Sequence, residues 1–312
     1  MITVLVRIPN HVGDACMAVP AVRALQAAGL ACALVCKPWG ESLLAGLGCA
    51  CTPITGNLWA DRRVVRRAIG VLGRDAELRG LVLPNSLGSA LLFALAGVPS
   101  AGLATGGRRA LLRWSIAVPD GGHEVERFHA AVSGALQAWG KPRPVLPETL
   151  GLPLTASQRA GADTLLRTHG LGRYALIAPV ATGMHHGRAK HWSHFAALLP
   201  ALRERGLQTA AAPPDREAAA VRTALPGALL LPPVDLGIYA ALAERASLVV
   251  ANDSGSSHVA AAVGARQVTI FGVTDRRRTG PWSPRAICVG AEGRWPEVSE
   301  VIVAIDQALA LK

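Results

Sequence analysis

Short apolar runs alternate with longer amphipathic stretches along most of the chain. In the first half, the apolar runs predict strands at 3–8, 31–36 and 79–84, and more weakly near Gly102 and Ile116. The amphipathic stretches predict helices at 17–29, 61–73 and 89–97. Such an alternation of strand and helix is typical of a parallel sheet that helices cover on both faces.

The proline-rich stretch 141–158 interrupts this rhythm, and we interpret it as a linker. After it, strands are predicted at 173–179, 207–212, 227–231, 247–251 and 267–271, and helices at 191–206, 215–225, 236–246 and 256–264. Two similar halves therefore predict an α/β protein of two Rossmann-like domains, with parallel sheets that face a central cleft. The expected boundaries are 1–150 and 151–312, with the alternative that the last helix packs back on the first domain.

The composition fits this architecture, and the net charge has two possible explanations. Apolar residues make up 51% and charged residues 17% of the 312 residues, which is enough for a large core. The six cysteines lie mostly in apolar strings, so we expect reduced thiols in a cytoplasmic protein. No signal peptide is expected, and the apolar centre of the segment 86–107 is too short to cross a bilayer. The net charge of +11 reflects either codon bias toward arginine or an anionic partner.

Ligands of open parallel sheets bind beyond the carboxyl ends of the strands, so candidate chemistry is sought in those turns. The first turn is PNHVGD, at 9–14, which contains Asn10, Gly13 and Asp14. Gly13 permits close approach of backbone to a ligand. Asp14 is expected at the start of a helix, where it either caps that helix or serves as a general base toward the cleft.

The second turn is the loop APVATGMHHGRAKHWSHF, at 178–195. Arg188 and Lys190 are expected just before a helix, where cations and the positive end of the helix dipole bind phosphate together. The four histidines of this loop are accompanied by no carboxylate or cysteine, so a metal site is not expected. Gly183 and Gly187 give the loop conformational freedom.

The third turn begins NDSGSSHVAAAVG, at 252–264, and follows a predicted strand. Asp253 or Ser254 is a candidate cap of the next helix. In the alternative that we favour, Asp253, the N–H groups around Gly255 and His258 hold sugar hydroxyls and an anion together. A hydrolase with Ser254 and His258 is disfavoured because no GxSxG motif is present.

Two arginine clusters accompany these turns. Arg276, Arg277 and Arg278 follow the turn that contains Thr274 and Asp275, and they are either a solvated run or anion contacts. A predicted basic helix carries Arg62, Arg63, Arg66 and Arg67, with Arg74 beyond it. This helix is either an exposed basic face or a docking site for anionic lipid or a phosphorylated acceptor.

Five stretches together resemble a known family. They are RIPNHVGDACMAVPAVRAL, LPNSLGSALLFALAGVP, ATGGRRALL, GRAKHWSHFAAL and NDSGSSHVAAAVGARQVTIFGVTDRRRTGP. In this order, which spans nearly the whole chain, they resemble the heptosyltransferases of bacterial lipopolysaccharide synthesis, glycosyltransferase family 9. Within the family, the likeness is greatest to the enzymes that add the second heptose of the inner core.

The resemblance implies a GT-B fold and an inverting glycosyltransferase that moves heptose from ADP-heptose to a heptose of the inner core. It implies no cofactor and no metal, and it makes Asp14 the base and Lys190 the cation at the leaving diphosphate. Donor contacts would be Lys190, Arg188, Glu217, Asp253, Ser254, Gly255, His258, Thr274 and Asp275. Acceptor contacts would be Asn10, Gly13, Asp14, Arg62, Arg63 and Arg66. The partners would be a nucleotide sugar and an anionic glycolipid, with peripheral contact at the cytoplasmic face of the inner membrane and no nucleic acid.

Several positions depart from the family pattern and leave alternatives open. Ser256 stands where relatives often carry proline or a bulky residue, and His191 stands where arginine is frequent. A different nucleotide sugar or a different acceptor therefore remains an alternative. A basic protein that binds membranes or nucleic acid is a more distant one, because none of the two tyrosines and four phenylalanines lies among the arginine clusters. A dehydrogenase is disfavoured because no GxGxxG follows the first strand.

Overall fold

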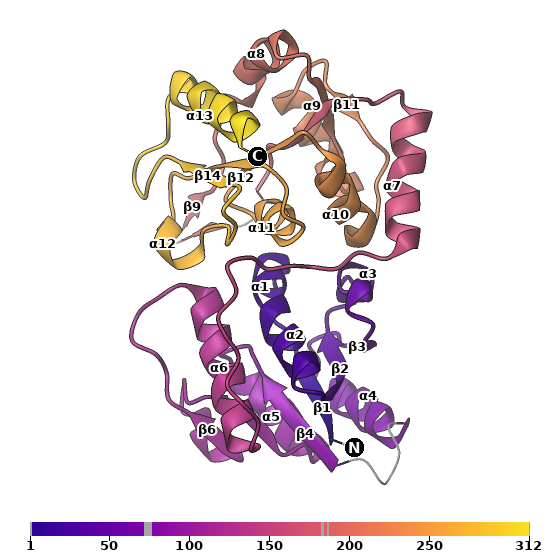
Figure 1. Cartoon of the computed structure of the whole chain (residues 1–312), viewed down its shortest axis with the longest axis vertical. Helices are drawn as coiled ribbons and strands as arrows, with labels where there is room; N and C mark the ends of the chain where they lie inside the picture. Colours follow the sequence, from indigo (N-terminus) through magenta and orange to yellow (C-terminus); the bar gives the residue numbers. More distant parts are fainter. Residues whose placement is uncertain (1, 72–76, 182–183, 186, 312) are drawn as a thin grey trace. The chain divides into compact units, whose positions relative to one another are not determined.

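The computed structural model describes residues 2–71, 77–181, 184–185 and 187–311. The chain divides into two compact units, Met1–Pro147 and Glu148–Lys312. Each unit contains a six-stranded sheet in which every pair of neighbouring strands is parallel (Figure 1). Arg74 and Gly183, named above, and His186, one of the four histidines of the loop at 178–195, lie outside the described residues.

The sheet of the first unit has the strand order β3-β2-β1-β4-β5-β6. Its strands are β1 (Ile2–Arg7), β2 (Ala31–Cys36), β3 (Ala50–Pro53), β4 (Glu77–Val82), β5 (Ser100–Leu103) and β6 (Trp114–Ile116). Its helices are α1 (Val12–Met17), α2 (Val19–Ala27), α3 (Gly40–Leu43), α4 (Leu58–Val71), α5 (Leu87–Ala96) and α6 (Glu124–Ala138), with the 3-10 turns η1 (Ala45–Leu47) and η2 (Arg108–Leu111). The order reverses between β1 and β4, as in doubly wound sheets.

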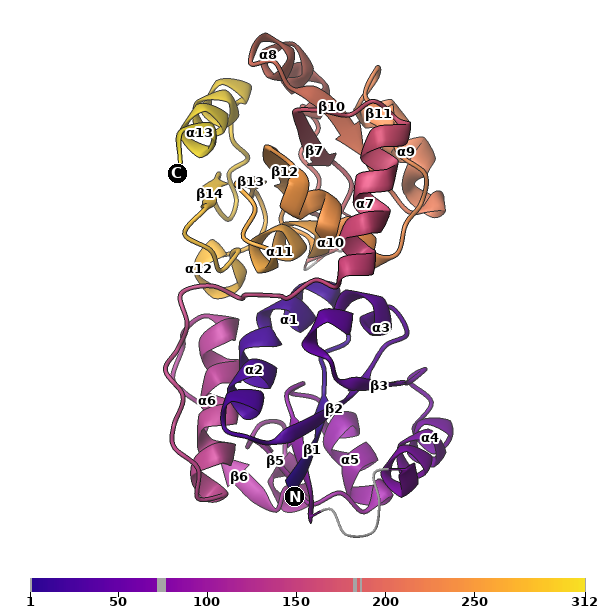
Figure 2. The same cartoon turned by 45° about the vertical axis from the view of Figure 1, so that its right-hand side comes forward.

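Both faces of this sheet are covered, as the continuous apolar strands require. Helices α2 and α6 lie together on one face, and α4 and α5 lie together on the other (Figures 1 and 2). On the second of these faces, Leu5, Val35 and Val82 of the strands pack with Val65 of α4 and Phe93 of α5. The apolar stretch at 86–107 folds as the predicted helix and strand. Among the described residues, no helix is both long and apolar enough to span a bilayer.

The helix predicted at 17–29 corresponds to α2, and a separate short helix, α1, precedes it. Helix α1 starts at Val12, and α2 starts at Val19. Pro20 lies in the first turn of α2, where its missing N–H has no partner to lose, whereas inside one continuous helix it would break a hydrogen bond. The early start places Asp14 in the first turn of α1.

The sheet of the second unit has the order β11-β10-β7-β12-β13-β14, beside a separate two-stranded pair, β8-β9. Its strands are β7 (Tyr174–Ala178), β8 (Met184–His185), β9 (Arg188–Ala189), β10 (Gln208–Ala211), β11 (Leu229–Leu230), β12 (Leu248–Asn252), β13 (Gln267–Ile270) and β14 (Ala286–Val289). Its helices are α7 (Ala156–Thr168), α8 (Leu199–Glu204), α9 (Ala218–Ala224), α10 (Leu236–Arg245), α11 (Gly255–Ala262), α12 (Arg276–Thr279) and α13 (Val298–Ala310), with the 3-10 turns η3 (Phe195–Leu198) and η4 (Asp215–Glu217).

One face of the second sheet holds a large core that includes the last helix. Trp192 and Phe195 pack there with Val250 and Ile270 of the strands, and Ile305 of α13 completes the cluster. Helices α7, α10 and α11 form a separate group (Figure 2). The last helix therefore contributes to the core of its own unit.

Two long helices, α6 and α7, were not predicted from the pattern. Both begin with a capping box, in which the side chain of the N-cap residue and that of the residue three positions later bond to each other's backbone N–H groups. The pairs are His123 with Glu126 at α6, and Thr155 with Gln158 at α7. The helix α7 takes up the last residues of the stretch that was interpreted as a linker.

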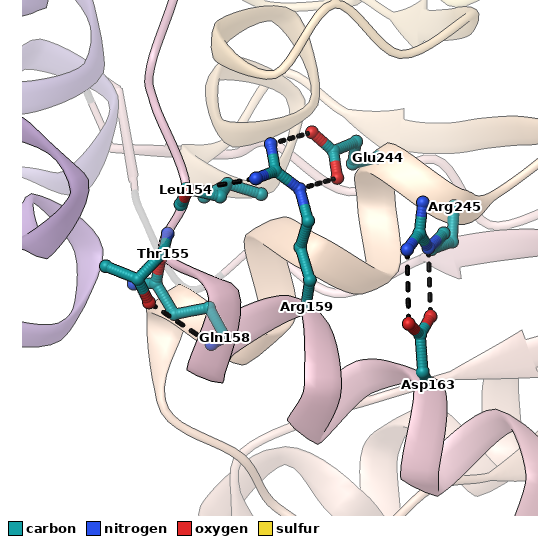
Figure 3. Close-up of polar contacts among 7 residues, drawn as sticks. All are labelled: Leu154, Thr155, Gln158, Arg159, Asp163, Glu244 and Arg245. Carbon is teal, nitrogen blue, oxygen red and sulfur yellow. Dashed lines mark hydrogen bonds and ion pairs between the residues drawn. The ribbon is translucent and has the colours of Figure 1, made fainter.

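Two arginine–carboxylate pairs fasten α7 to α10 (Figure 3). Arg159 donates two hydrogen bonds of 2.8 Å to Glu244, and Arg245 donates to Asp163 at 2.9 and 3.1 Å. Arg159 also donates to the carbonyl of Leu154 at 3.0 Å. One pair has its arginine on α7 and the other on α10, so the two helices are held in one register.

The pair at Asp163 gives a prediction on acid stability. Its hydrogen bonds from Arg245 lower the pKa of Asp163 from its ordinary value of 3.8. A carboxyl group with a lowered folded-state pKa stabilises the fold above the unfolded-state pKa, and this contribution is lost as the pH falls through the folded-state value. We expect Asp163→Asn to lower the Tm at neutral pH, and the difference from wild type to shrink as the pH falls below 3.8 through the lowered folded-state pKa. Thermal melts across pH measure it, with exposed Asp215→Asn as control; a difference that persists in acid would contradict the assignment.

Candidate functional site

A buried ionic cluster lies at the carboxyl edge of the second sheet. Lys190 Nζ donates to Asp253 Oδ2 at 2.7 Å, and Thr274 Oγ1 donates to the same oxygen at 2.6 Å. Asp253 is 4% exposed and Thr274 is 5% exposed. A carboxylate buried to this degree needs a cation and hydrogen bonds, and these two donors supply them.

Topology brings these three residues together. Asp253 directly follows β12, and Thr274 follows β13, the neighbouring strand. Lys190 directly follows β9, in the loop that leaves β7 on the other side of β12. Three loops therefore converge at one edge, where the carboxyl-end rule predicts a ligand site.

The N-terminus of α11 lies next to Asp253. Ser254 is the N-cap residue, yet its side chain makes no capping hydrogen bond, and its buried Oγ has no hydrogen-bond partner among the described residues. The carboxylate of Asp253 is bonded to Lys190 and Thr274 instead. The interpretation of Asp253 or Ser254 as a simple side-chain cap was therefore wrong. Helix α11 begins at Gly255 with no side-chain cap, and its dipole favours an anion there.

Other donor candidates lie on α11 and on neighbouring elements. His258 is on the first turns of α11 and is 5% exposed. Glu217 ends η4 and is partly buried, with Arg216 at 3.4 Å. Tyr239, on α10, was not singled out from the sequence; burial raises its pKa, and the Ser256 side chain and Glu217 are near it. A lone tyrosine among the apolar residues of the first turns of α10 was the available signal.

Asp275 has a local structural role. Its Oδ1 accepts from the backbone N–H of Arg277 at 3.0 Å and caps α12, and its carboxylate pairs with the Arg277 side chain. These hydrogen bonds from Arg277 lower the pKa of Asp275. Arg276, Arg277 and Arg278 form the short exposed helix α12, which was not predicted.

The loop with Arg188 and Lys190 differs from the prediction. Arg188 is exposed on the two-residue strand β9, which pairs with β8 in an antiparallel hairpin. The next helical turn, η3, begins only at Phe195, and α-helix follows from Leu199. The expected helix dipole directly after Lys190 was therefore wrong, and the nearby helix N-terminus is that of α11. Within the part of the chain that the structure describes, no three His, Cys, Asp or Glu side chains are grouped to hold a metal ion.

In the first unit, the candidate base lies at the corresponding edge. Asp14 is the third residue of α1 and is partly exposed, beside buried Gly13. The N-cap residue is His11, so Asp14 does not occupy the cap position. Asn10 is exposed, and its Oδ1 accepts a hydrogen bond from the buried guanidinium of Arg7.

Helix α4 carries the basic candidates on different faces. Arg63 and Arg66 are exposed. Arg62 is partly buried, and its Nε donates to the carbonyl of Leu95 at 2.8 Å, which fastens α4 to the last turn of α5. Part of the Arg62 guanidinium is therefore occupied by the fold. Exposed Trp59 accompanies the arginines on this helix.

Gly272, two residues before Thr274, gives a prediction on the shape of this edge. A Cβ at Gly272 would lie 2.0–2.4 Å from three ring atoms of Trp295. We expect Gly272→Ala to destabilise the protein by about 1–3 kcal/mol, as overpacked core positions do. Urea unfolding measures this, and Gly88→Ala, in a helix with nothing within 4 Å of its Cβ, is the matched control. Equal stability of the two variants would refute the close packing of Trp295.

Comparisons with known proteins place this geometry in context. The family model described as glycosyltransferase family 9 (heptosyltransferase) matches residues 65–304. The comparison with curated proteins gave no match. Among solved structures, the chain is similar to the E. coli ADP-heptose lps heptosyltransferase II, with a TM-score of 0.79 and 22% identity, covering 99% of this chain and 98% of that one.

Two further structures show the same likeness. A family 9 glycosyl transferase from Veillonella parvula DSM 2008 has a TM-score of 0.77 and 17% identity, covering 99% of this chain and 90% of that one. The E. coli heptosyltransferase WaaC with ADP-2-deoxy-2-fluoro heptose has a TM-score of 0.75 and 20% identity, covering 98% of each chain. These likenesses establish the GT-B fold class. With the family match over most of its length, the chain belongs to glycosyltransferase family 9, the heptosyltransferases, and is a glycosyltransferase.

Proposed function

We propose that this protein transfers a heptose from ADP-heptose to a heptose of the inner core of lipopolysaccharide, with inversion at the anomeric carbon. The observation that carries the proposal is the Lys190–Asp253–Thr274 cluster beside the N-terminus of α11, which has no side-chain cap. A cation and free helix N–H groups are suited to a diphosphate. The names of solved relatives include ADP and an ADP-heptose analogue, which supports an ADP-sugar as donor.

In the proposed reaction, an acceptor hydroxyl attacks the anomeric carbon while Asp14 takes its proton. The bond from that carbon to the β-phosphate oxygen breaks, and ADP leaves with the electron pair. Lys190 and the N–H groups around Gly255 stabilise the charge that develops on the diphosphate. Lys190 and Thr274 both donate to Oδ2 of Asp253, so Oδ1 is the oxygen that accepts a hydrogen bond from the sugar. The proposal includes no cofactor and no metal.

The remaining donor contacts are proposed around these groups. His258 and Ser254 are on or beside α11, and Glu217 is proposed at the ribose of the nucleotide. Arg188 lies two residues before Lys190, and Thr274 is itself a member of the cluster. The carboxylate of Asp275 caps α12 and pairs with Arg277. Asp275 would therefore contact the donor through its backbone, or through its carboxylate after the ion pair with Arg277 has opened.

The acceptor and its location form the second part of the proposal. Asn10, Gly13 and Asp14 would contact the acceptor, and Arg63 and Arg66 would meet its anionic groups, with Arg62 contributing only the part not bonded to Leu95. The glycolipid acceptor implies peripheral contact with the cytoplasmic face of the inner membrane. The charge of +11 supports an anionic partner.

A donor competition experiment tests the proposal. Binding of ADP-heptose, ADP and other nucleotide sugars is measured by calorimetry on the whole protein. The proposal predicts that ADP-heptose binds and that ADP competes with it. Selective binding of another nucleotide sugar would favour a different family 9 donor. Ser256, which departs from the family pattern and lies next to Tyr239, is the residue that motivates this alternative. Absence of any nucleotide-sugar binding would refute the donor site.

A further inference from the structure

A buried amide joins two of the three loops of the ionic cluster, the loop that carries Lys190 and the turn that carries Asp253. Asn252 is the last residue of β12 and is fully buried. Its Nδ2 donates to the carbonyl of Pro179 at 2.5 Å, and its Oδ1 accepts from the backbone N–H of Trp192 at 3.1 Å. Pro179 directly follows β7, and Trp192 lies two residues beyond Lys190.

We propose that Asn252 is a positioning residue that holds the Lys190 loop against the turn that carries Asp253. The proposal rests on the proposed function, in which Lys190 meets the donor diphosphate. Lysine presents a point charge on a flexible stem of four carbons, so the place of its Nζ depends on where the backbone is held. Asn252 fixes that backbone on both sides, at the start and near the end of the loop.

The strand register explains why this position is suited to the task. Ala251 of β12 pairs with Ala178 of β7, so Asn252 and Pro179 leave the sheet side by side. An apolar side chain at 252 would leave the buried Trp192 N–H without this acceptor, which is costly, and would leave the Pro179 carbonyl with the His191 ring as its remaining side-chain partner among the described residues. The asparagine side chain has an NH2 group that donates to the Pro179 carbonyl and an oxygen that accepts from the Trp192 N–H.

Trp192 and His191 strengthen the same attachment. The Trp192 indole is 2% exposed, and its Nε1 donates to the carbonyl of Pro296 at 2.9 Å. The His191 ring bonds the Pro179 carbonyl through Nδ1 at 3.0 Å. The backbone after Lys190 is therefore held by a packed indole and by an amide, and only the amide also holds the turn before Asp253.

A thermodynamic cycle tests the proposal. ADP binding is measured by calorimetry for wild type, Asn252→Ala, Lys190→Ala and the double variant. Because Asn252 is proposed to act through Lys190, Asn252→Ala should weaken ADP binding about tenfold in the wild-type background, and by less than about twofold when Lys190 is already alanine. An equal loss in both backgrounds, or no loss in the wild-type background, would overturn the proposal.

Two further variants separate positioning from general stability. Gln267→Met removes another fully buried amide, on the neighbouring strand β13. Gln267 pairs with Val249, three residues before Asn252 on β12, and its Nε2 donates to Thr269 Oγ1. We expect it to lower the Tm while ADP affinity stays within about twofold of wild type. Should Asn252→Ala fail to fold, Asn252→Asp keeps the acceptor for Trp192 and replaces the donor, and the same cycle applies to it.

The outcomes distinguish this inference from the function on which it rests. If wild type does not bind ADP, the proposed donor site fails and the inference fails with it. If wild type binds ADP and Lys190→Ala weakens binding, the function stands, and the cycle alone decides the role of Asn252. An ADP affinity of Gln267→Met that falls as far as that of Asn252→Ala would reduce Asn252 to a general stability role.

Discussion

Lys190→Ala is expected to lower kcat by about 10²–10³, which corresponds to roughly 2.7–4 kcal/mol of transition-state stabilisation. The charge that develops on the departing diphosphate is greatest in the transition state, so a preorganised cation acts most strongly there. In the structure Lys190 Nζ lies 2.7 Å from the buried carboxylate of Asp253, so the protein itself fixes the position of the cation. Steady-state kinetics with the native donor and acceptor measure the effect.

Two controls define the result for Lys190. Lys141→Ala, in the proline-rich segment, changes the net charge equally and should leave kcat unchanged. Removing the cation also leaves the buried Asp253 carboxylate with Thr274 as its one remaining side-chain donor among the described residues, so the Tm of Lys190→Ala must be measured beside its kcat. An intact fold with near-normal kcat would contradict the assignment of Lys190 to the leaving group.

Asp14→Asn is expected to lower kcat by about 10²–10⁴, the usual contribution of a general base. The amide has nearly the same shape as the carboxylate but cannot accept the proton of the acceptor hydroxyl. Because Asp14 lies in the first unit and the donor cluster lies in the second, ADP affinity should stay at the wild-type value. Kinetics and ADP calorimetry on the same preparation measure both quantities.

The control for Asp14 is Asp120→Asn, an exposed carboxylate of the same unit. It should retain full activity. Loss of ADP binding in Asp14→Asn would mean that the residue supports the fold or the donor site. A kcat within a few fold of wild type would rule Asp14 out as the base.

Elements with strong local signals could be predicted from the sequence. The strand β2 was predicted at 31–36, the residues that the structure assigns, because a continuous apolar run lies between Gly29 and the turn that begins at Lys37 and Pro38. Helix α7 was missed because it follows Pro153 and carries few buried residues, although its capping box was readable. The hairpin β8-β9 could not be predicted, since strands of two residues have no periodicity.

The sequence named the residues of the ionic cluster, but it did not show how they contact one another. Asp253 and Lys190 were named because loops at the carboxyl ends of parallel strands converge, and Thr274 was named from the family resemblance. That Lys190 and Thr274 both bond one oxygen of Asp253 depends on strand order and loop path, which a single sequence does not encode locally. The same holds for Asn252, whose partners lie 60 and 73 positions earlier in the chain.

The measurement that tests the central claim most directly is ADP release from ADP-heptose by the purified protein, with and without heptose-primed core glycolipid. The account predicts release that depends on the glycolipid, with a mass increase of one heptose on the acceptor. Release that is the same without acceptor, or no release although ADP-heptose binds, would contradict transfer to the inner core of lipopolysaccharide.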